Sequence, residues 1–287
     1  MNIFNDIQSV RDQVNRWKQD GLTIGFVPTM GNLHDGHLQL VQQAKQHVDR
    51  VVVSIFVNPM QFNQANDFSA YPRTLENDIA LLDDASVDVL FVPQDDELYP
   101  VDQKKTTKVI VPGLSDMLEG ECRPGHFTGV TTIVCKLFNI VQPDIVCFGE
   151  KDFQQLMLVR RMVAELNMPI TILAVATRRE ADGLAMSSRN NRLDGEQRSK
   201  APVIYQVLTG VYKQIKQGIR DYSRLEQDAV TKLTNSGFVV EYVAIRRSSD
   251  LALPVPGDSN LVILTAARLG DIRLIDNIPL SINPDLG

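Results

Sequence analysis

Two hydrophobic patterns alternate along the first 176 residues of the chain. Short, nearly continuous apolar runs predict strands that are covered on both faces, as in a parallel sheet. These predicted strands span 22–27, 51–57, 87–92, 144–148 and 170–176. Elsewhere apolar residues recur three or four positions apart, which predicts amphipathic helices over 5–18, 38–44, 75–82, 128–140 and 154–166. This alternation predicts an α/β fold built on a doubly wound parallel sheet, with ligands at the carboxyl ends of the strands.

The pattern changes after residue 176. Residues 181–198 are polar and rich in turn-forming pairs, and the apolar spacing after them predicts helices near 199–217 and 222–236. Two strand-like runs, 239–245 and 261–266, come after the helices. Helices followed by strands predict a separate, smaller α+β domain. We therefore expect two domains, residues 1–176 and residues 177–287.

Composition narrows the class of protein. With 287 residues, 44% hydrophobic and 22% charged, the chain is typical of globular proteins. Its net charge of −6 argues against a nucleic-acid-binding surface. The three cysteines are irregularly spaced, as in proteins with reduced thiols. The N-terminus has no apolar signal core, and no run is long enough to cross a membrane. We expect a cytoplasmic protein with neither nucleic acid nor membrane as a partner.

The turn after the strand at 22–27 concentrates the chemistry. Its glycines have neither the dinucleotide-binding spacing nor the lysine of a P-loop. It carries instead His34 and His37, which share one face of the helix expected to start there. Phosphate oxygens are attracted to the N–H groups of a helix start, and Gly36 allows close approach to the backbone. We predict a nucleotide phosphate site here; a zinc pair without a third ligand and a pair of surface histidines without a role stay open.

Several segments resemble one known family. His34-x-Gly36-His37 resembles the His-x-Gly-His signature of nucleotidylyl transferases and class I aminoacyl-tRNA synthetases. Further family-like segments follow in order along the chain: Phe56-Val-Asn-Pro-Met-Gln-Phe62, Tyr71-Pro-Arg-Thr74, Pro124-Gly-His-Phe127, Phe148-Gly-Glu-Lys-Asp-Phe-Gln-Gln155 and Asp182-Gly-Leu-Ala-Met-Ser-Ser-Arg-Asn190. Together with residues 28–37 they resemble the pantothenate synthetase (pantoate–β-alanine ligase) family over nearly the whole chain.

The resemblance implies a Rossmann-like N-terminal domain and a ligation in two steps. The carboxylate of (R)-pantoate attacks the α-phosphorus of ATP, which gives pantoyl adenylate and pyrophosphate. The amine of β-alanine then attacks the acyl carbon and releases AMP and (R)-pantothenate. The resemblance further implies that Mg²⁺ accompanies ATP and that the protein is a homodimer. Because the Met186–Arg189 loop lies at the expected domain junction, we expect the second domain to act as a lid that delivers Arg189 when ATP is bound. A nucleotidyltransferase that stops at an adenylylated product and a non-catalytic nucleotide-binding module stay open as alternatives.

The resemblance also implies which residues act. The catalytic residues are His34, His37, Lys151 and Arg189. The ATP-binding residues are Met30, Gly31, Asn32, Leu33, His34, Asp35, Gly36, His37, Gly149, Glu150, Lys151, Asp152, Arg178, Met186, Ser187, Ser188 and Arg189. Gln61 and Gln155 bind the small substrate, because an amide both donates and accepts hydrogen bonds.

Arg178 departs from the family pattern, and Asp78 lies outside the nucleotide-binding set. Arg178 stands where the family pattern leads us to expect a small apolar residue, so we expect this position to contact the nucleotide mainly through its backbone. Asp78 is a candidate for holding the magnesium that accompanies ATP. Magnesium relies mainly on water and substrate phosphates, so it leaves a faint mark on a sequence, and we assign no metal-binding set.

Overall fold

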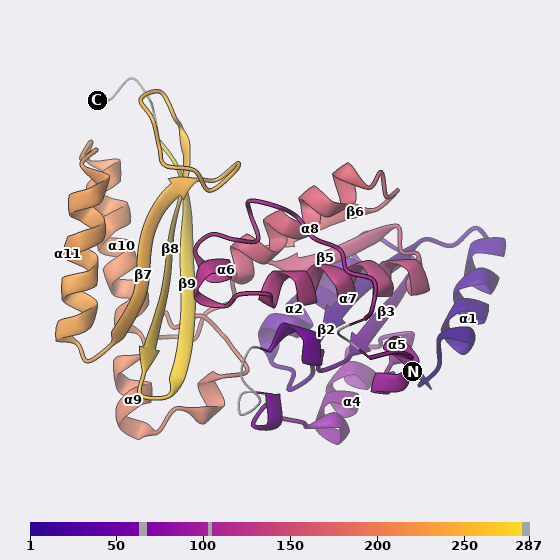
Figure 1. Ribbon diagram of the computed structural model, residues 1–287. Coiled ribbons are helices and arrows are strands. Elements are labelled where there is room, and N and C mark those ends of the chain that lie inside the picture. Colours follow the sequence, from indigo (N-terminus) through magenta and orange to yellow (C-terminus); the bar gives the residue numbers. More distant parts are fainter. Residues whose placement is uncertain (63–67, 103–104, 283–287) are drawn as a thin grey trace. The chain divides into compact units, whose positions relative to one another are not determined.

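Two sheets organise the chain in the computed structural model, which describes residues 1–62, 68–102 and 105–282 (Figure 1). The first sheet belongs to a compact unit formed by Met1–Glu150 and Gln154–Ala176. The second belongs to a unit formed by Lys151–Phe153 and Thr177–Gly287. The short segment at 151–153 therefore groups with the C-terminal part of the chain, although its neighbours in sequence belong to the first unit.

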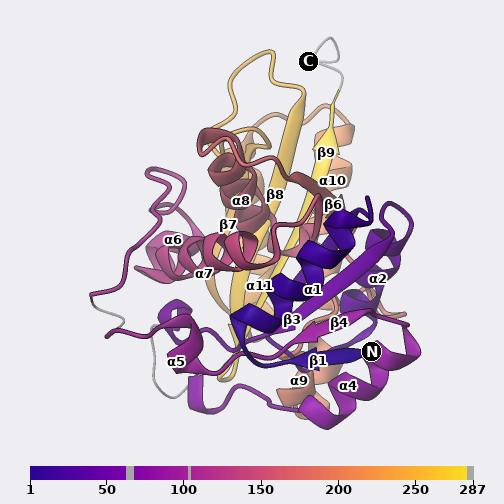
Figure 2. The same cartoon turned by 90° about the vertical axis from the view of Figure 1, so that its right-hand side faces the viewer.

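The first sheet has six strands in the order β1-β4-β3-β2-β5-β6, and every described pairing is parallel. This confirms the predicted fold class. The strands are β1 (Asn2–Phe4), β2 (Ile24–Thr29), β3 (Arg50–Ile55), β4 (Val89–Phe91), β5 (Ile145–Gly149) and β6 (Thr171–Val175). The sequence did not predict β1, which lies at the edge of the sheet beside β4 (Figure 2). Three largely exposed residues are too few to show a period.

Helices cover both faces of this sheet, which explains why its strands read as continuous apolar runs. On one face, Val41 and Leu82 from two helices join the core around Val53. On the other face, the ring of Phe138 packs edge-on against Phe26 at 6.4 Å. The helices of this part of the chain are α1 (Ile7–Gln19), α2 (Asp35–Lys45), η1 (Pro59–Gln61), α4 (Leu75–Asp84), α5 (Asp95–Leu98), α6 (Glu119–Cys122), α7 (His126–Val141), η2 (Glu150–Asp152) and α8 (Phe153–Glu165).

The strand order reverses between β2 and β5, which are neighbours in the sheet, with Gly25 paired to Ile145. From β2 the order continues through β3 and β4, and from β5 it continues to β6. In open parallel sheets, ligands bind at such a reversal, beside the carboxyl ends of the strands. The segments that leave β2 and β5 there are residues 30–34 and 150–152. The fold therefore brings the histidine-containing turn to the place where a ligand is expected.

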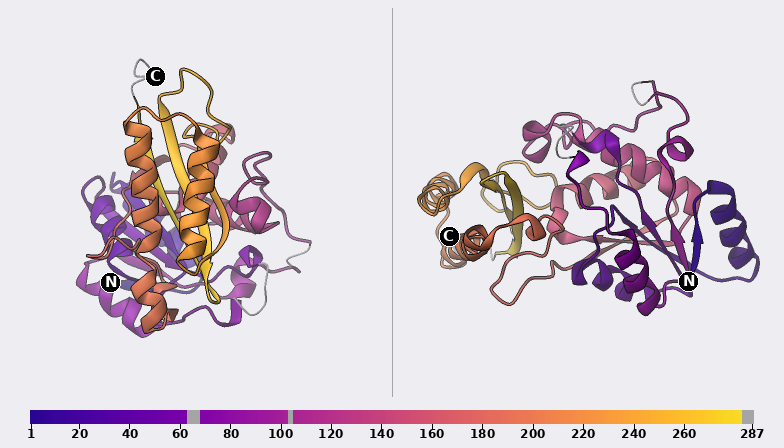
Figure 3. Two further views of the ribbon diagram at one scale, coloured as in Figure 1. Left: turned by 90° about the vertical axis from the view of Figure 1, so that its left-hand side faces the viewer. Right: turned by 90° about the horizontal axis from the view of Figure 1, so that it is seen from below.

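The second unit contains an antiparallel sheet of β7 (Val239–Arg247), β8 (Asn260–Leu269) and β9 (Ile272–Ser281). The helices α10 (Val203–Lys216) and α11 (Tyr222–Asn235) cover one face of it (Figure 3). The helix predicted near 199–217 is confirmed as α10, but it begins only after Pro202, and a separate short helix, α9 (Gly195–Lys200), precedes it. The sequence also missed β9, whose apolar pattern is interrupted by Asp276, Asn277 and Pro279.

Candidate active site

Asp78 shapes the loop that follows β2. The chain there passes through two residues with positive φ, Gly31 (79°) and Asn32 (50°). Asp78 is 2% exposed; its Oδ2 accepts the N–H of Asn32 at 2.9 Å and its Oδ1 accepts the N–H of Leu33 at 2.8 Å. A Cβ at Gly31 would lie 3.0 Å from Asp78 Oδ2, so a side chain there would push against the carboxylate. The glycine and the aspartate together fix this turn.

These bonds change the interpretation of Asp78. The sequence made it a candidate magnesium ligand, but magnesium keeps several waters and needs an accessible site. A carboxylate that is 2% exposed and binds two backbone N–H groups fits a structural role instead. Across the described ranges of the chain, no group of three or more His, Cys, Asp or Glu side chains is arranged to hold a metal ion.

His34 and His37 cap the start of α2 reciprocally. His34 is the N-cap, and its Nδ1 accepts the N–H of Gly36 at 3.1 Å. His37 Nδ1 in turn accepts the N–H of His34 at 3.3 Å. An Nδ1 that accepts a hydrogen bond carries no proton, so each neutral ring holds its proton on Nε2. The two ring centroids are 4.1 Å apart, which confirms that both histidines lie on one side of the helix start.

The amide of Gln61 has a fixed orientation, set by two buried residues. Asn58 Nδ2 donates to the carbonyl of Gly129 at 3.0 Å, so Asn58 Oδ1 must face the other way, where Tyr99 donates to it at 2.7 Å. Burial raises the pKa of the Tyr99 hydroxyl far above its ordinary value, so it stays a donor. Asn58 Nδ2 also donates to Gln61 Oε1 at 3.1 Å. Gln61 Nε2 is thereby turned toward Met30, whose Sδ it contacts at 2.8 Å.

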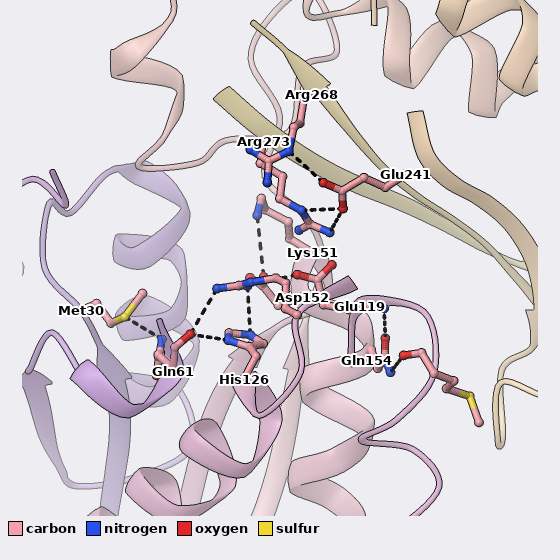
Figure 4. A network of polar contacts seen from close by, with 12 residues as sticks. Met30, Gln61, Glu119, His126, Lys151, Asp152, Gln154, Glu241, Arg268 and Arg273 are labelled. Carbon is pink, nitrogen blue, oxygen red and sulfur yellow. Dashed lines mark hydrogen bonds and ion pairs between the residues drawn. The ribbon is translucent and has the colours of Figure 1, made fainter. Parts of the chain in front are cut away.

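The backbone of Gln61 is held as firmly as its side chain. Its carbonyl oxygen accepts from His126 Nδ1 at 2.7 Å and from Arg123 at 3.2 Å (Figure 4). Arg123 also lies 3.1 Å from His126 Nε2, so that nitrogen is the acceptor and the ring is the Nδ1–H tautomer. Glu119 pairs with Arg123 at 3.1 Å. The 3-10 turn η1 is thus anchored to the start of α7, where Gly129 allows its backbone to pass.

On α8 the structure separates the two glutamines of the Phe-Gln-Gln segment. Gln154 is 5% exposed, and its Nε2 donates to the carbonyls of Leu114 and Met117 at 2.7 and 2.9 Å. Its Oε1 accepts from the N–H of Glu119 (Figure 4). Gln154 therefore fixes the segment before α6. Gln155, the predicted substrate-binding amide, is half-buried, and its role stays a prediction.

Lys151 follows the carboxyl end of β5 and belongs to the second unit. Gly149 and Glu150 end the strand and begin η2 in the first unit. The Lys151 side chain is 17% exposed, and its Nζ lies 3.8 Å from Asp152 Oδ1 (Figure 4). A lysine restricted in this way differs from a freely solvated surface lysine.

The Met186–Arg189 loop is tied to the strand-like segment before it. Met186 donates its N–H to the carbonyl of Arg178 at 2.9 Å, and Arg179 forms an antiparallel bridge with Ala185. Within the loop, the N–H of Arg189 donates to Ser187 Oγ at 3.2 Å. The side chain of Arg178 is exposed, while its carbonyl helps to fix the loop. The predicted phosphate contacts of Ser187, Ser188 and Arg189 stay predictions.

Sequence reasoning missed the residues that hold the site together. Asn58 and His126 stand inside quoted motifs but were given no role, and Tyr99 lies outside every motif. A role was predicted for Arg178 but none for its neighbour Arg179. Each acts through a partner far away in sequence, which no local pattern reveals. The motif positions themselves were the available signal for Asn58 and His126.

Comparison with known proteins identifies the family. The family described as pantoate-beta-alanine ligase matches residues 2–279. The pantothenate synthetase of Nitrosococcus oceani is 49% identical over 282 residues, which cover 98% of this chain and 99% of that protein. That of Vibrio cholerae serotype O1 is 51% identical over 286 residues, covering 99% and 97%. Within the described residues, no helix is both long and apolar enough to span a membrane.

Solved structures agree over the same extent. A pantothenate synthetase from Thermus thermophilus superposes with a TM-score of 0.89 at 43% identity, covering 97% of this chain and 99% of that one. A pantoate-beta-alanine ligase from Francisella tularensis, complexed with beta-gamma ATP and beta-alanine, gives 0.82 at 35% identity and covers 97% of each chain. Since the match extends over nearly the whole length in both sequence and structure, the chain belongs to the pantoate–β-alanine ligase family.

Proposed function

We propose that this chain joins (R)-pantoate to β-alanine through the residues described above. The reaction is that of the family: ATP and pantoate give pantoyl adenylate and pyrophosphate, and the amine of β-alanine then displaces AMP. The observation that carries the assignment of residues is the reciprocal cap of His34 and His37. It fixes both rings through Nδ1 at a helix start beside the strand-order reversal, where phosphate is favoured, so that each neutral ring carries its N–H at Nε2.

In the first step a carboxylate approaches a polyanion, so the phosphate charge has to be offset by fixed donors. His37 Nε2–H donates to an oxygen of the α-phosphate, and His34 Nε2–H assists beside it. Neither donor needs to reorganise, because the backbone bonds at Nδ1 hold both rings. Met30, Gly31, Asn32, Leu33, Asp35 and Gly36 form the surrounding nucleotide loop.

Gln61 supplies the matching donor for pantoate. Its Nε2 faces Met30 because Asn58 holds its Oε1, so it offers N–H to a hydroxyl or carboxylate oxygen of the substrate. Gln155 provides the second amide of the pocket. Pantoate thus meets a donor of fixed orientation, which suits a substrate whose carboxylate must point at phosphorus.

The second unit supplies cations and hydroxyls for the phosphates. Lys151 and Arg189 offset the charge that leaves with pyrophosphate, and Ser187 and Ser188 add hydroxyl donors. Gly149, Glu150, Asp152, Met186 and the backbone of Arg178 complete the ATP site. Residues 177–287 act as a lid domain on the ATP-binding domain 1–176. Mg²⁺ arrives with ATP and is held mainly by its phosphates and by water.

We further infer a homodimer located in the cytoplasm. The cysteines support the location: Cys122, Cys135 and Cys147 are all free thiols in the structure. The homodimer follows from the family resemblance, and its test is the mass of the native protein in solution. ATP, (R)-pantoate and β-alanine are its only proposed partners, with no role for nucleic acid or membrane.

An omission experiment tests the function. The protein is mixed with MgATP, (R)-pantoate and β-alanine, and each component is left out in turn. We expect pyrophosphate release with ATP and pantoate alone, and AMP release only when β-alanine is added. Full ATP turnover without pantoate would refute the mechanism. Pyrophosphate without AMP in the complete mixture would favour an enzyme that stops at the adenylate.

Gln61→Ala is expected to raise the KM for pantoate by about tenfold to 10²-fold, because a hydrogen bond to a charged group contributes roughly 1.5–3 kcal/mol. The KM for ATP should stay within about twofold. Gln61→Glu has the same shape but replaces the N–H by a carboxylate oxygen, so it should impair pantoate use more severely. The exposed Gln19→Ala serves as the control. Initial rates at varied pantoate and ATP decide; equal damage to both substrates would count against the role.

A further inference from the structure

Lys151 is connected to the last strand of the chain by one buried side chain. Its backbone carbonyl accepts a hydrogen bond from Asn277 Nδ2 at 2.9 Å, across 126 positions of sequence. Asn277 lies on β9 and is 3% exposed. Both residues belong to the second unit. The lysine that follows β5 of the first sheet is therefore held by the sheet of the second unit.

Asn277 has little freedom of its own. Its N–H donates to Asp276 Oδ1 at 2.8 Å, and its carbonyl accepts from Arg179 at 3.3 Å. In the sheet it pairs with Leu264 of β8. With its backbone fixed on several sides, its amide presents the Lys151 carbonyl with a donor in one defined position. Asn277 therefore fixes the position of the Lys151 backbone as well as filling space in the core.

The fixed point behind Asn277 is a buried ion pair. Arg179 binds Asp276 in two-point fashion, at 2.7 and 2.9 Å, and the Asp276 side chain is 3% exposed. The guanidinium also lies 3.8 Å from the ring centre of Tyr205. Burial raises the pKa of the Asp276 carboxyl, and the charges of Arg179 and Lys151 oppose that rise. Two-point pairing of this kind is geometrically specific.

Arg179 also contacts the segment that precedes the Met186–Arg189 loop, which carries the other proposed phosphate-binding residues. The backbone of Arg179 forms its bridge with Ala185, directly before the Met186–Arg189 loop. The guanidinium donates to the carbonyl of Gly183 at 3.1 Å as well. Through these contacts within a single unit, Arg179 connects the loop that carries Arg189 with the strand that holds Lys151.

We propose that Asn277, itself fixed by the Arg179–Asp276 pair, is a positioning residue that holds Lys151 at a set distance from the Met186–Arg189 loop. The inference rests on the proposed phosphate-binding roles of Lys151 and Arg189. The cationic side chains of Lys151 and Arg189 must keep a fixed spacing if both are to stabilise the negative charge that one triphosphate carries in the transition state. The hydrogen bond from Asn277 to Lys151 and the Arg179–Asp276 ion pair set that spacing before ATP binds.

The test begins with Asn277→Ala. Pyrophosphate release from MgATP and pantoate is expected to slow by roughly tenfold to 10²-fold, as for a small misplacement of a reacting group. The KM for pantoate is expected to stay unchanged. Thr265→Val is the matched control, because it removes a buried hydrogen bond from the adjacent strand, to the carbonyl of Tyr242, without touching Lys151. It should lower the unfolding temperature to a similar degree but leave the rate of pyrophosphate release unchanged.

A double-mutant cycle with Lys151→Ala separates positioning from general damage. If Asn277 acts through the Lys151 side chain, Asn277→Ala will slow the enzyme in the wild-type background but not in the Lys151→Ala background. The same slowing in both backgrounds would overturn the inference while leaving the proposed function intact, as would no slowing in either. A Lys151→Ala variant with the full rate of pyrophosphate release would instead overturn the proposed role of Lys151, and with it the inference.

Discussion

Replacing Asp78 by alanine is expected to abolish most adenylate formation and to destabilise the protein together. The carboxylate is the acceptor for two successive backbone N–H groups, those of Asn32 and Leu33, in a turn with positive φ. Each buried N–H that loses its acceptor costs roughly 1–3 kcal/mol. We therefore expect the free energy of unfolding to fall by about 2–6 kcal/mol. Because the histidine cap begins at His34, directly after Leu33, kcat/KM for ATP should fall by more than about 10²-fold.

Asp78→Asn refines this prediction, because an amide keeps one acceptor oxygen but turns an NH₂ group toward the second N–H. Its loss of stability should lie between that of the wild type and that of the alanine variant. Asp84→Ala, an exposed position on the same helix, is the control for helix α4. Urea unfolding and pyrophosphate release are measured on all four proteins. An Asp78→Ala protein with normal stability and normal ATP use would show that the turn does not depend on this carboxylate.

The sheet of the first unit was predictable because its strands are covered on both faces. Such strands need no polar alternation, so β2, β3 and β5 appear in the sequence as plain apolar runs. Strand β9 was hidden for the opposite reason. Asp276 and Asn277 place buried polar groups in its middle, where their cost is offset by Arg179 and by the Lys151 carbonyl. Only the folded chain reveals those partners.

In the candidate site, too, the sequence revealed local relations between residues but not long-range ones. His34 and His37 were found from sequence because their relation is local: a helix start and a spacing of three positions. The role of Asp78 depends on partners 45 and 46 positions away, and Tyr99 reaches Asn58 across 41. Sequence pattern thus identifies groups that face a ligand, while the residues that orient them require the tertiary structure.

Two substitutions of His37 are expected to separate its capping bond from its chemistry. Asparagine carries its oxygen near the position of Nδ1, so it keeps an acceptor for the N–H of His34 but offers nothing at Nε2. His37→Asn should therefore change the free energy of unfolding by less than about 1 kcal/mol, the usual size of a cap. Its rate of pyrophosphate release should nevertheless fall by about 10²–10³-fold, as for the loss of one transition-state donor.

Glutamine makes the reverse exchange, because its amide N–H reaches the position of Nε2 while the acceptor near the backbone is lost. His37→Gln is expected to be less stable than His37→Asn but to retain more activity. The ranking of the two variants by stability is thus the reverse of their ranking by activity, and this reversal is the sharpest test of the fixed tautomer. Stability by urea unfolding and rates with saturating pantoate are compared for both variants. If activity instead follows stability, with asparagine the more active, His37 acts in this protein as a helix cap and the phosphate donor has to be sought elsewhere.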